Sequence, residues 1–433
     1  MNSGRMRVDI AFGQAALPLD LDPERFDARV LLPHDPPALA DPVAAIGAAL
    51  DAPIGCAPLA AIARARQPRS VAIAIADHTR PVPDHLIVPA LVERLGVPDA
   101  AVTILIGTGT HRGSTAAEIE RILGPAAKRF RVINHDCHDD ANLVHVGDSS
   151  CGGACWLNRA WVDADLRLAT GFIEPHFFAG FSGGTKAVVP GIAGFATVQH
   201  FHRAKLIAHP GTTWGDQRAN PLQRLTREMT ALCPAQFIAN VTLDGAKRIT
   251  GVFAGDATRA HDAGCAAALQ EAFVTVERTY PVVVTSNSGY PLDQNFYQTV
   301  KGISAAARIV APGGTILVAA ECRAGLPGEG EFGQLLADAR GDEALLAEFM
   351  ATERTRLDQW QVQTLLQCAK KARIILHSRL SPSDRARTRV EHSDDLVATL
   401  AELQRAHGAR LPIAILPRGP LTIPTLAATA RGG

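Results

Sequence analysis

The segment from Glu174 to His202 combines two kinds of residue that a reactive site needs. Its titratable or nucleophilic side chains are His176, Lys186, His200 and His202. Imidazoles titrate near neutral pH and bind metals, and a partly desolvated lysine amine can attack a carbonyl carbon. Glycines tolerate positive φ or let a ligand approach the backbone closely, and the segment holds Gly180, Gly183 and Gly184. The segment therefore predicts a loop suited to acid–base, covalent or metal chemistry.

Two common glycine motifs are nearly present in the chain, and both fail at a defining position. A phosphate-binding P-loop needs Gly before its lysine and Ser or Thr after it, but Thr185 precedes Lys186 and Ala187 follows. A dinucleotide fingerprint needs a third glycine where the turn at 107–112 has Arg112. The sequence therefore favours neither an NTPase nor an ordinary Rossmann enzyme.

Two of the fifteen histidines stand out because each follows an apolar run that predicts a buried strand. They are His111, after the glycine-rich turn at 107–110, and His176, after 166–172. A lone histidine in such a place is more often structural than functional. Two of them suit acid–base work, because a racemase must remove and return a proton on either side of one carbon.

Further polar groups follow two other predicted strands. Asp77 and Arg80 come after 71–76, where they could form a turn cap with a surface ion pair, or bind a carboxylate or phosphate and orient a histidine. Gln298 and Lys301 lie three residues apart on a predicted helix, with Tyr297 beside them. They are either a solvated helix face or a clamp for a carboxylate.

The chain alternates predicted strands and helices, which is typical of α/β proteins with mainly parallel sheets. Apolar runs predict buried strands at 71–76, 102–106, 166–172, 282–285, 315–320, 372–376 and 411–416. Thr115 and Glu118 form a capping box that begins a helix. We expect an N-terminal domain at 1–275, a second domain at 276–416, and a tail at 417–433 that packs back on the first domain. Strand ends from both domains would then line an active-site cleft between the domains.

Composition narrows the class of protein. The 433 residues carry no formal net charge, which argues against a nucleic-acid partner or a membrane-surface binder. No apolar run approaches the roughly 20 residues of a membrane span, and the first residues lack the apolar core of a signal peptide. Eight scattered cysteines fit a reducing cytoplasm, so we expect a cytoplasmic protein. The polar run Arg131–Asp140 could bind a metal, although a solvated polar edge explains it as well.

Five motifs together give the chain a resemblance to the nickel-dependent lactate racemase family, and they occur in the family's order. They are D-H-T-R at 77–80, G-T-G-T-H-R at 107–112, the run at 174–202, N-F-Y-Q-T-V-K-G at 295–302 and P-R-G-P at 417–420. The resemblance implies nickel and a pyridinium-3,5-bisthiocarboxylic acid mononucleotide, which is joined to a lysine and binds the metal through S, C and S. It also implies a small 2-hydroxy acid as the partner molecule, and leaves open whether that acid is lactate.

The resemblance also implies roles for individual residues. Lys186 matches the attachment lysine and His202, sixteen residues later, the nickel ligand, although the local Q-H-F-H makes His200 a rival. His111 and His176 match the acid–base pair, while Asp77 and Arg80 match the motif that positions the catalytic site. Further cofactor contacts are implied at Arg80, Gly107, Thr108, Gly109, Thr110, Gly183 and Gly184. Substrate contacts are implied at Tyr297, Gln298, Lys301 and Trp360.

The implied reaction is racemisation or epimerisation by transfer of a hydride from the α-carbon and its return to the other face. A 2-keto acid would form in between, and the two histidines would handle the hydroxyl proton. Two readings compete with it. The chain could be a non-catalytic two-domain protein that binds a small anion or a metal, or it could be a nicotinamide-dependent dehydrogenase.

Overall fold

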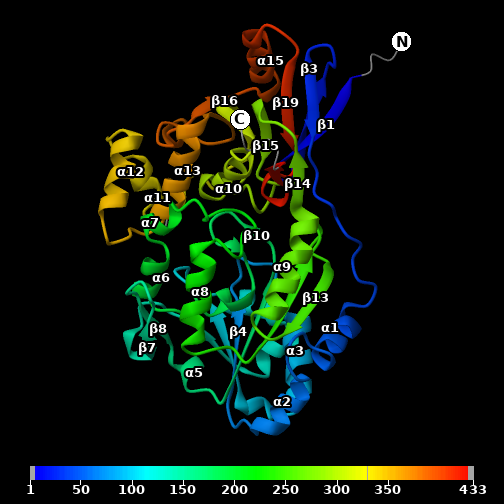
Figure 1. The fold of residues 1–433 in the computed structure, drawn as a ribbon, viewed down its shortest axis with the longest axis vertical. Coiled ribbons are helices and arrows are strands. Elements are labelled where there is room, and N and C mark those ends of the chain that lie inside the picture. Colours follow the sequence, from blue (N-terminus) through cyan, green and yellow to red (C-terminus); the bar gives the residue numbers. More distant parts are fainter. Residues whose placement is uncertain (1–4, 329, 428–433) are drawn as a thin grey trace. The chain divides into compact units, whose positions relative to one another are not determined.

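The computed structural model describes residues 5–328 and 330–427, which form two compact units. Unit 1 comprises the chain up to His34, Arg203–Ile207 and the chain from Ala272 onward. Unit 2 comprises Asp35–His202 and Ala208–Glu271. Each unit is built on a six-stranded sheet, and the elements can be followed in Figure 1.

The sheet of unit 2 has the strand order β13-β12-β9-β4-β5-β6. Its strands are β4 (Val71–Ala76), β5 (Val102–Gly107), β6 (Arg131–Asn134), β9 (Leu166–Phe172), β12 (Phe237–Leu243) and β13 (Ile249–Gly255). All neighbours run parallel except β12 and β13. The chain moves outward from β4 through β5 to β6 and then returns to place β9 on the other side of β4. Ligands of open α/β sheets bind at the carboxyl ends of strands where the order reverses in this way.

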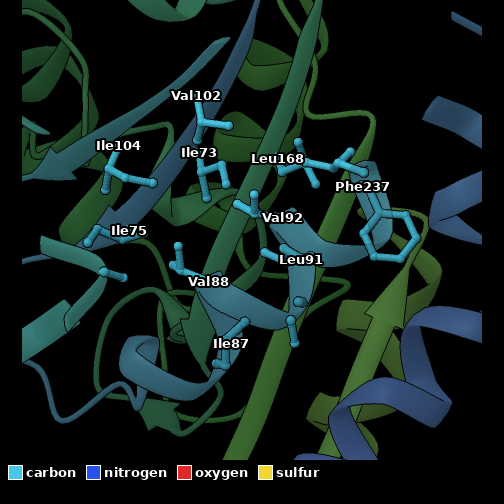
Figure 2. Close-up of a cluster of buried hydrophobic side chains, with 14 of the residues drawn as sticks. Ile73, Ile75, Ile87, Val88, Leu91, Val92, Val102, Ile104, Leu168 and Phe237 are labelled. Carbon is cyan, nitrogen blue, oxygen red and sulfur yellow. The ribbon is translucent and has the colours of Figure 1, made fainter. Parts of the chain in front are cut away.

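Apolar side chains of this sheet pack against helix α3 (Asp84–Leu95). Figure 2 shows Ile73 of β4 and Leu168 of β9 facing Val88 and Leu91 of the helix. All four are fully buried. Each such side chain contributes about 1.5–3 kcal/mol relative to an exposed position, so this core holds the carboxyl ends of β4 and β9 in place.

Shorter elements complete unit 2. The helices are α1 (Pro42–Asp51), α2 (Leu59–Arg66), α4 (Ala116–Leu123), α5 (Arg159–Val162), α6 (Phe195–Phe201), α8 (Pro221–Ala231) and α9 (Arg259–Ala272), whose last residue falls to unit 1. Two small antiparallel pairs are β7 (Leu143–Asp148) with β8 (Ala154–Asn158), and β10 (Pro175–His176) with β11 (Gly180–Phe181). Short 3-10 turns are η1 (Asp99–Ala101), η2 (Gly124–Lys128), η3 (Asp140–Asn142) and η4 (Gly184–Ala187).

The sheet of unit 1 has the order β18-β17-β16-β15-β19-β3, with all neighbours parallel. Its strands are β15 (Tyr280–Ser286), β16 (Val310–Ala319), β17 (Arg373–His377), β18 (Glu391–Ser393), β19 (Leu411–Leu416) and β3 (Phe26–Val30). The order reverses between β15 and β19. Helix α10 (Phe296–Ala306) follows β15, the strand at which the order reverses. Its first turn therefore comes after the carboxyl end of a strand where α/β sheets bind ligands.

The remaining elements of unit 1 are helical or form two-stranded sheets. The helices are α7 (Ala204–Ile207), α11 (Phe332–Leu336), α12 (Asp342–Ala351), α13 (Gln359–Lys371), α14 (Pro382–Arg385) and α15 (Leu396–His407), with the turn η5 (Gly419–Leu421). Strand β1 (Met6–Phe12) pairs with β2 (Ala15–Leu21), and β14 (Phe273–Val276) pairs with β20 (Ile423–Leu426).

The α/β class and the mainly parallel sheets predicted from the sequence are confirmed. The division of the chain differs in two respects from the expected one. The strand at Phe26–Val30 pairs with β19, so the chain up to His34 belongs with the C-terminal residues and not with the N-terminal domain. The tail, as far as residue 427, pairs with β14 inside unit 1, and 428–433 lie outside the described residues.

No helix within residues 5–328 and 330–427 combines the length and the apolar character that a transmembrane helix requires.

Candidate active site

The carboxyl end of β4 delivers Asp77, which is buried and bonded to a histidine from the neighbouring strand end. Its Oδ2 lies 2.7 Å from Nδ1 of His111, and its Oδ1 accepts hydrogen bonds from the backbone N–H and the hydroxyl of Thr79. Burial opposes ionisation, but the hydrogen bonds of His111 and Thr79 and the charge of Arg80 outweigh it and lower the pKa of Asp77. An ionised Asp77 accepts the proton on Nδ1, so the Nε2 lone pair of neutral His111 is left for chemistry.

The turn after β5 is held by backbone contacts that place His111. The backbone N–H of Gly109, which has φ 57°, donates to the carbonyl of Gly191 at 2.9 Å. The hydroxyl of Thr108 donates to the carbonyl of His135 at 2.6 Å. The backbone N–H of His111 donates to the carbonyl of Thr108 at 2.9 Å. This turn is therefore tied to the loop that follows Lys186. The predicted capping box of Thr115 and Glu118 is present at the start of α4.

His176 lies on the short β10–β11 hairpin that follows β9, and its ring is buried. Its Nδ1 accepts a hydrogen bond of 3.2 Å from the backbone N–H of Ala179, so the neutral ring carries its proton on Nε2. Its ring stacks on Phe177 and meets Phe178 edge-on, with centroids 4.5 Å apart in the second pair. Asn220 at the start of α8 supports the hairpin by donating to the carbonyl of Phe178 at 2.9 Å.

Lys186 is presented by η4, a tight turn that begins with Gly183 and Gly184. Both glycines have positive φ, 74° and 57°, and a Cβ atom at either would collide with neighbouring atoms. At Gly191 a Cβ would lie 2.3 Å from the carbonyl oxygen of Ala187. The positive φ that glycine permits at Gly183 and Gly184 is therefore present, and closely packed backbone surrounds the turn that carries Lys186.

His202 ends the short helix α6 and is buried. Its Nδ1 donates to the carbonyl of Val198 at 2.8 Å, which puts the proton of the neutral ring on Nδ1. Burial lowers the pKa of His202 to about 4; the hydrogen bond to Val198 opposes this shift, and the charge of Lys186 adds to it. A neutral imidazole whose other nitrogen is fixed by a carbonyl is the usual form of a histidine metal ligand.

His200 points to a different neighbour. Its Nε2 lies 3.2 Å from the thiol of Cys151, in the turn between β7 and β8. Its ring also packs so closely on Gly153 that a Cβ there would lie 2.2 Å from it. His200 is therefore engaged with Cys151 and Gly153, and which of the two histidines would bind a metal stays a prediction.

Two residues near the lysine turn were missed by the sequence analysis. Asn240 is fully buried on β12, and its Oδ1 accepts a hydrogen bond of 2.6 Å from the backbone N–H of Gly184. His261 on α9 is buried, and its Nε2 lies 2.9 Å from the carbonyl oxygen of Ser182. Asn240 stands as a polar residue within the apolar strand F-I-A-N-V-T-L, which was the available signal.

The polar run Arg131–Asp140 does not form a metal site in the described part of the chain. Its first four residues are β6. His135, which follows, is buried and bonded to the carbonyl of Ala193 and the side chain of Asn158 at 2.9 and 3.1 Å. The run is thus partly a structural support for the loop after η4.

Unit 1 gathers the four predicted substrate residues on two helices in contact. Tyr297, Gln298 and Lys301 lie in the first turns of α10, and Asn295 caps this helix by accepting from the backbone N–H of Gln298 at 2.9 Å. Trp360 of α13 donates its indole N–H to the hydroxyl of Tyr297 at 3.1 Å. Trp360 and Tyr297 are therefore in contact, while their role in substrate binding stays a prediction.

Unit 2 brings the predicted catalytic and cofactor residues to one edge of its sheet. Asp77 and His111 are bonded, the turn of His111 is bonded to the loop after Lys186, and Lys186 acts electrostatically on His202. Phe178 links two of the histidines, because its ring contacts both His176 and His202. That this group and the α10 group share one cleft stays a prediction.

Comparison with known proteins agrees with this arrangement. Residues 12–215 match the family model described as the lactate racemase N-terminal domain, and residues 276–423 match that of the lactate racemase C-terminal domain. A lactate racemase of Lactiplantibacillus plantarum is 39% identical over 338 residues, which are 76% of each chain. One of Thermoanaerobacterium thermosaccharolyticum is 36% identical over 333 residues, 76% of this chain and 77% of that protein.

Solved structures give the same result. The apoprotein of the lactate racemase from Thermoanaerobacterium thermosaccharolyticum has a TM-score of 0.90 at 31% identity, covering 97% of this chain and 100% of that chain. A protein from Thermotoga maritima shares the fold, with a TM-score of 0.64 at 17% identity over 92% of this chain and 100% of that one. With both domain models matched over most of its length, the chain belongs to the lactate racemase family, and it is an isomerase.

Proposed function

We propose that this isomerase interconverts the two configurations at C2 of a small 2-hydroxy acid, either lactate or a larger one. The observation that carries the proposal is the position of Lys186. Its charge acts on His202, a buried neutral imidazole whose Nδ1 donates to the carbonyl of Val198, at the sheet edge that also holds the bonded pair of Asp77 and His111. Relatives of this chain named lactate racemase support the same reaction class.

The residues present fit the nickel-carrying mononucleotide implied by the family. Lys186 would carry the group through its amine, and His202 would offer Nε2 to the metal, since imidazole suits nickel. At Gly109 an added Cβ would meet open space, so the backbone there is open to a close approach by the group. When bound, this group supplies a position that accepts a hydride from C2 and returns it.

His111 is the residue best prepared to take the hydroxyl proton. Asp77 fixes Nδ1–H at 2.7 Å, which orients the ring and directs the lone pair of Nε2 away from the carboxylate. When Nε2 takes a proton, the buried negative charge of Asp77 stabilises the imidazolium that forms. The bond to Asp77, together with the chemistry of the imidazole ring, therefore supports an acid–base role for His111.

His176, in contrast, is arranged to donate a proton. With Nδ1 accepting from Ala179, its neutral ring presents an N–H at Nε2, which suits a donor to the substrate oxygen. To hold a second proton, the ring must give up the contact with Ala179, because an imidazolium has no acceptor nitrogen. One histidine ready to accept and one ready to donate is the arrangement that a racemase needs at the start of a turnover.

The α10 group supplies the groups that a carboxylate requires. Lys301 offers an ammonium and Gln298 an amide N–H, while the hydroxyl of Tyr297 is held by Trp360 at 3.1 Å. These residues would hold the carboxylate while C2 changes configuration. The hydroxy acid would then keep its orientation between the two proton-transfer steps.

The proposal is tested by supplying the purified protein, produced together with a cofactor-synthesis pathway, with single enantiomers of several 2-hydroxy acids. We expect chiral chromatography to show conversion to the racemate, and mass and metal analysis to show an added mass on Lys186 with about one nickel per chain. Protein that carries the group and nickel but converts none of the acids would refute the proposal. Formation of free NADH would point to a dehydrogenase instead.

A further inference from the structure

The turn that carries Lys186 depends on a backbone conformation that is open almost only to glycine. Gly183 has φ 74° and ψ −162°. Conformations of this kind persist where the surrounding structure holds them, and they concentrate at functional sites. Neighbouring groups must therefore hold Gly183 in this conformation.

Two buried side chains fix the peptide groups on either side of Gly183. The carbonyl of Ser182 accepts from Nε2 of His261 at 2.9 Å, and the backbone N–H of Gly184 donates to Oδ1 of Asn240 at 2.6 Å. The first peptide plane sets φ of Gly183 and the second sets ψ. Together the two hydrogen bonds define the direction in which the chain enters η4.

His261 is held in the form that this contact requires. A carbonyl only accepts, so the neutral ring must carry its proton on Nε2. Burial lowers the pKa of His261 to about 4; the hydrogen bond to Ser182 opposes this shift, and the charge of Arg227, followed by that of Lys186, adds to it. The ring also fills the space beside Gly184, where an added Cβ would lie 2.6 Å from its Cγ.

Asn240 is placed where stability alone would favour an apolar residue. The side chain is fully buried, and its Nδ2 has no hydrogen-bond partner among the described residues. A buried unpaired donor costs about 1–3 kcal/mol. The carbonyl oxygen of the same amide is used at Gly184, and this contact accounts for a polar side chain in the apolar strand β12.

We propose that Asn240 and His261 are positioning residues that clamp the two peptide groups around Gly183 and thereby hold the turn that presents Lys186. The inference rests on the proposed function, in which Lys186 is the attachment residue. Neither side chain needs to touch the cofactor or the substrate for this role.

The test measures the amine of Lys186 in the full-length protein without its cofactor. Limited acetic anhydride acetylates lysines in competition, and peptide mass analysis gives the ratio of Lys186 to Lys128, whose side chain is 82% exposed. Asn240→Leu and His261→Leu remove the clamp, whereas Asn240→Asp keeps the acceptor oxygen and His261→Gln keeps a donor in the place of Nε2. We expect the Leu variants to change the ratio about fivefold, the equivalent of one hydrogen bond of about 1 kcal/mol, and the Asp and Gln variants to stay near the wild type.

Thermal unfolding of the same variants separates positioning from folding. Leu variants that melt earlier but keep the wild-type labelling ratio would overturn the inference, and so would an equal change in the Gln and Leu variants of His261. The second arm loads each variant through the cofactor pathway and measures the added mass on Lys186. Wild-type protein without this mass would refute the proposed function, while a shifted labelling ratio in the apoprotein would still support the clamp.

Discussion

Nδ1 of His111 lies 2.7 Å from Oδ2 of Asp77, although the two residues end different strands of the sheet in unit 2. Parallel pairing of β4 with β5 places Ala76 opposite Gly107, so the residues that follow both strands emerge side by side. The bond joins a buried carboxylate to a histidine whose side chain is 53% exposed. The imidazole is thus anchored by a buried group while about half of its own side chain is exposed.

Asp77→Asn should lower turnover of the loaded enzyme by a factor of about 10²–10⁴, because the amide no longer stabilises a protonated His111 or fixes its tautomer. Thr79→Val is the matched control, since it removes one hydrogen bond to Oδ1 and leaves the contact with His111. Initial rates by chiral chromatography check both variants. Equal losses in the two variants would contradict a specific role of the pair.

Replacing each proposed acid–base residue by Gln tests whether it transfers a proton. A Gln side chain at His176 keeps an N–H near Nε2, but it cannot take up a proton, so we expect a loss as large as in His176→Ala, about 10²–10⁴-fold. His111→Gln should lose activity to a similar degree. If His176→Gln kept most of the wild-type rate, His176 would be a hydrogen-bond donor only.

Removal of the metal ligand should separate nickel binding from attachment of the organic group. We expect His202→Ala to retain the added mass on Lys186 and to lose most of its nickel, because the protein's proposed nitrogen ligand is absent. His200→Ala is the control, since its imidazole lies beside Cys151 at 3.2 Å. The nickel content of the loaded proteins shows which histidine binds the metal. Loss of nickel in the His200 variant alone would mean that His200, and not His202, is the ligand.

Lys301→Gln should act mainly on substrate binding. Loss of the ammonium removes a charge-assisted contact to the carboxylate, which is worth about 1.5–3 kcal/mol, so KM should rise about 10- to 100-fold. Lys370→Gln changes an exposed lysine on α13 and should leave KM as it is. Steady-state kinetics in both directions measure the effect. An unchanged KM in Lys301→Gln would exclude this lysine from carboxylate binding.

The stability of unit 2 should depend on pH through Asp84. This residue is fully buried in the first turn of α3, and burial raises its pKa to about 7 while the nearby Thr170 hydroxyl opposes the shift. Between about pH 4 and pH 7 the unfolded chain has lost this proton and the folded chain retains it, so the free energy of unfolding falls as pH rises.

Asp84→Asn removes this titration. We therefore expect the variant to gain stability over the wild type by a few kcal/mol between about pH 4 and pH 7, with a constant difference above that range. Urea unfolding at several pH values measures the difference. A difference that does not change with pH would show that Asp84 is ionised in the folded protein.

The sequence was a reliable guide where local pattern decides structure. The run V-A-I-A-I-A predicted a strand at 71–76, and β4 has those bounds because both of its faces are buried. The glycine-rich turn at 107–110 and the capping box at Thr115 were likewise readable, since positive φ and capping depend on nearby residues. His111 and Asp77 were expected near each other because parallel strands end at one edge.

Contacts between distant segments could not be read in this way. Asn240 and His261 reach the lysine turn from 56 and 79 residues away, and the sequence offers only the polar type of Asn240 within an apolar strand as a local signal. Strand β3 pairs with β19, which follows it by almost the full length of the chain. Pairing over such a distance is decided by which sheet edge remains open, and that depends on the complete fold.

The assignment of the chain up to His34 and of Arg203–Ile207 to unit 1 means that the backbone passes between the units four times, after residues 34, 202, 207 and 271. Neither unit is therefore encoded by one continuous stretch of the gene. A single cut between residues 35 and 279, including one between the two matched family domains, would put β3 on a different piece from the other strands of its sheet. β3 can pair with β19 only after the ribosome has synthesised Leu411–Leu416. A strand made early in synthesis is therefore among the last to be paired.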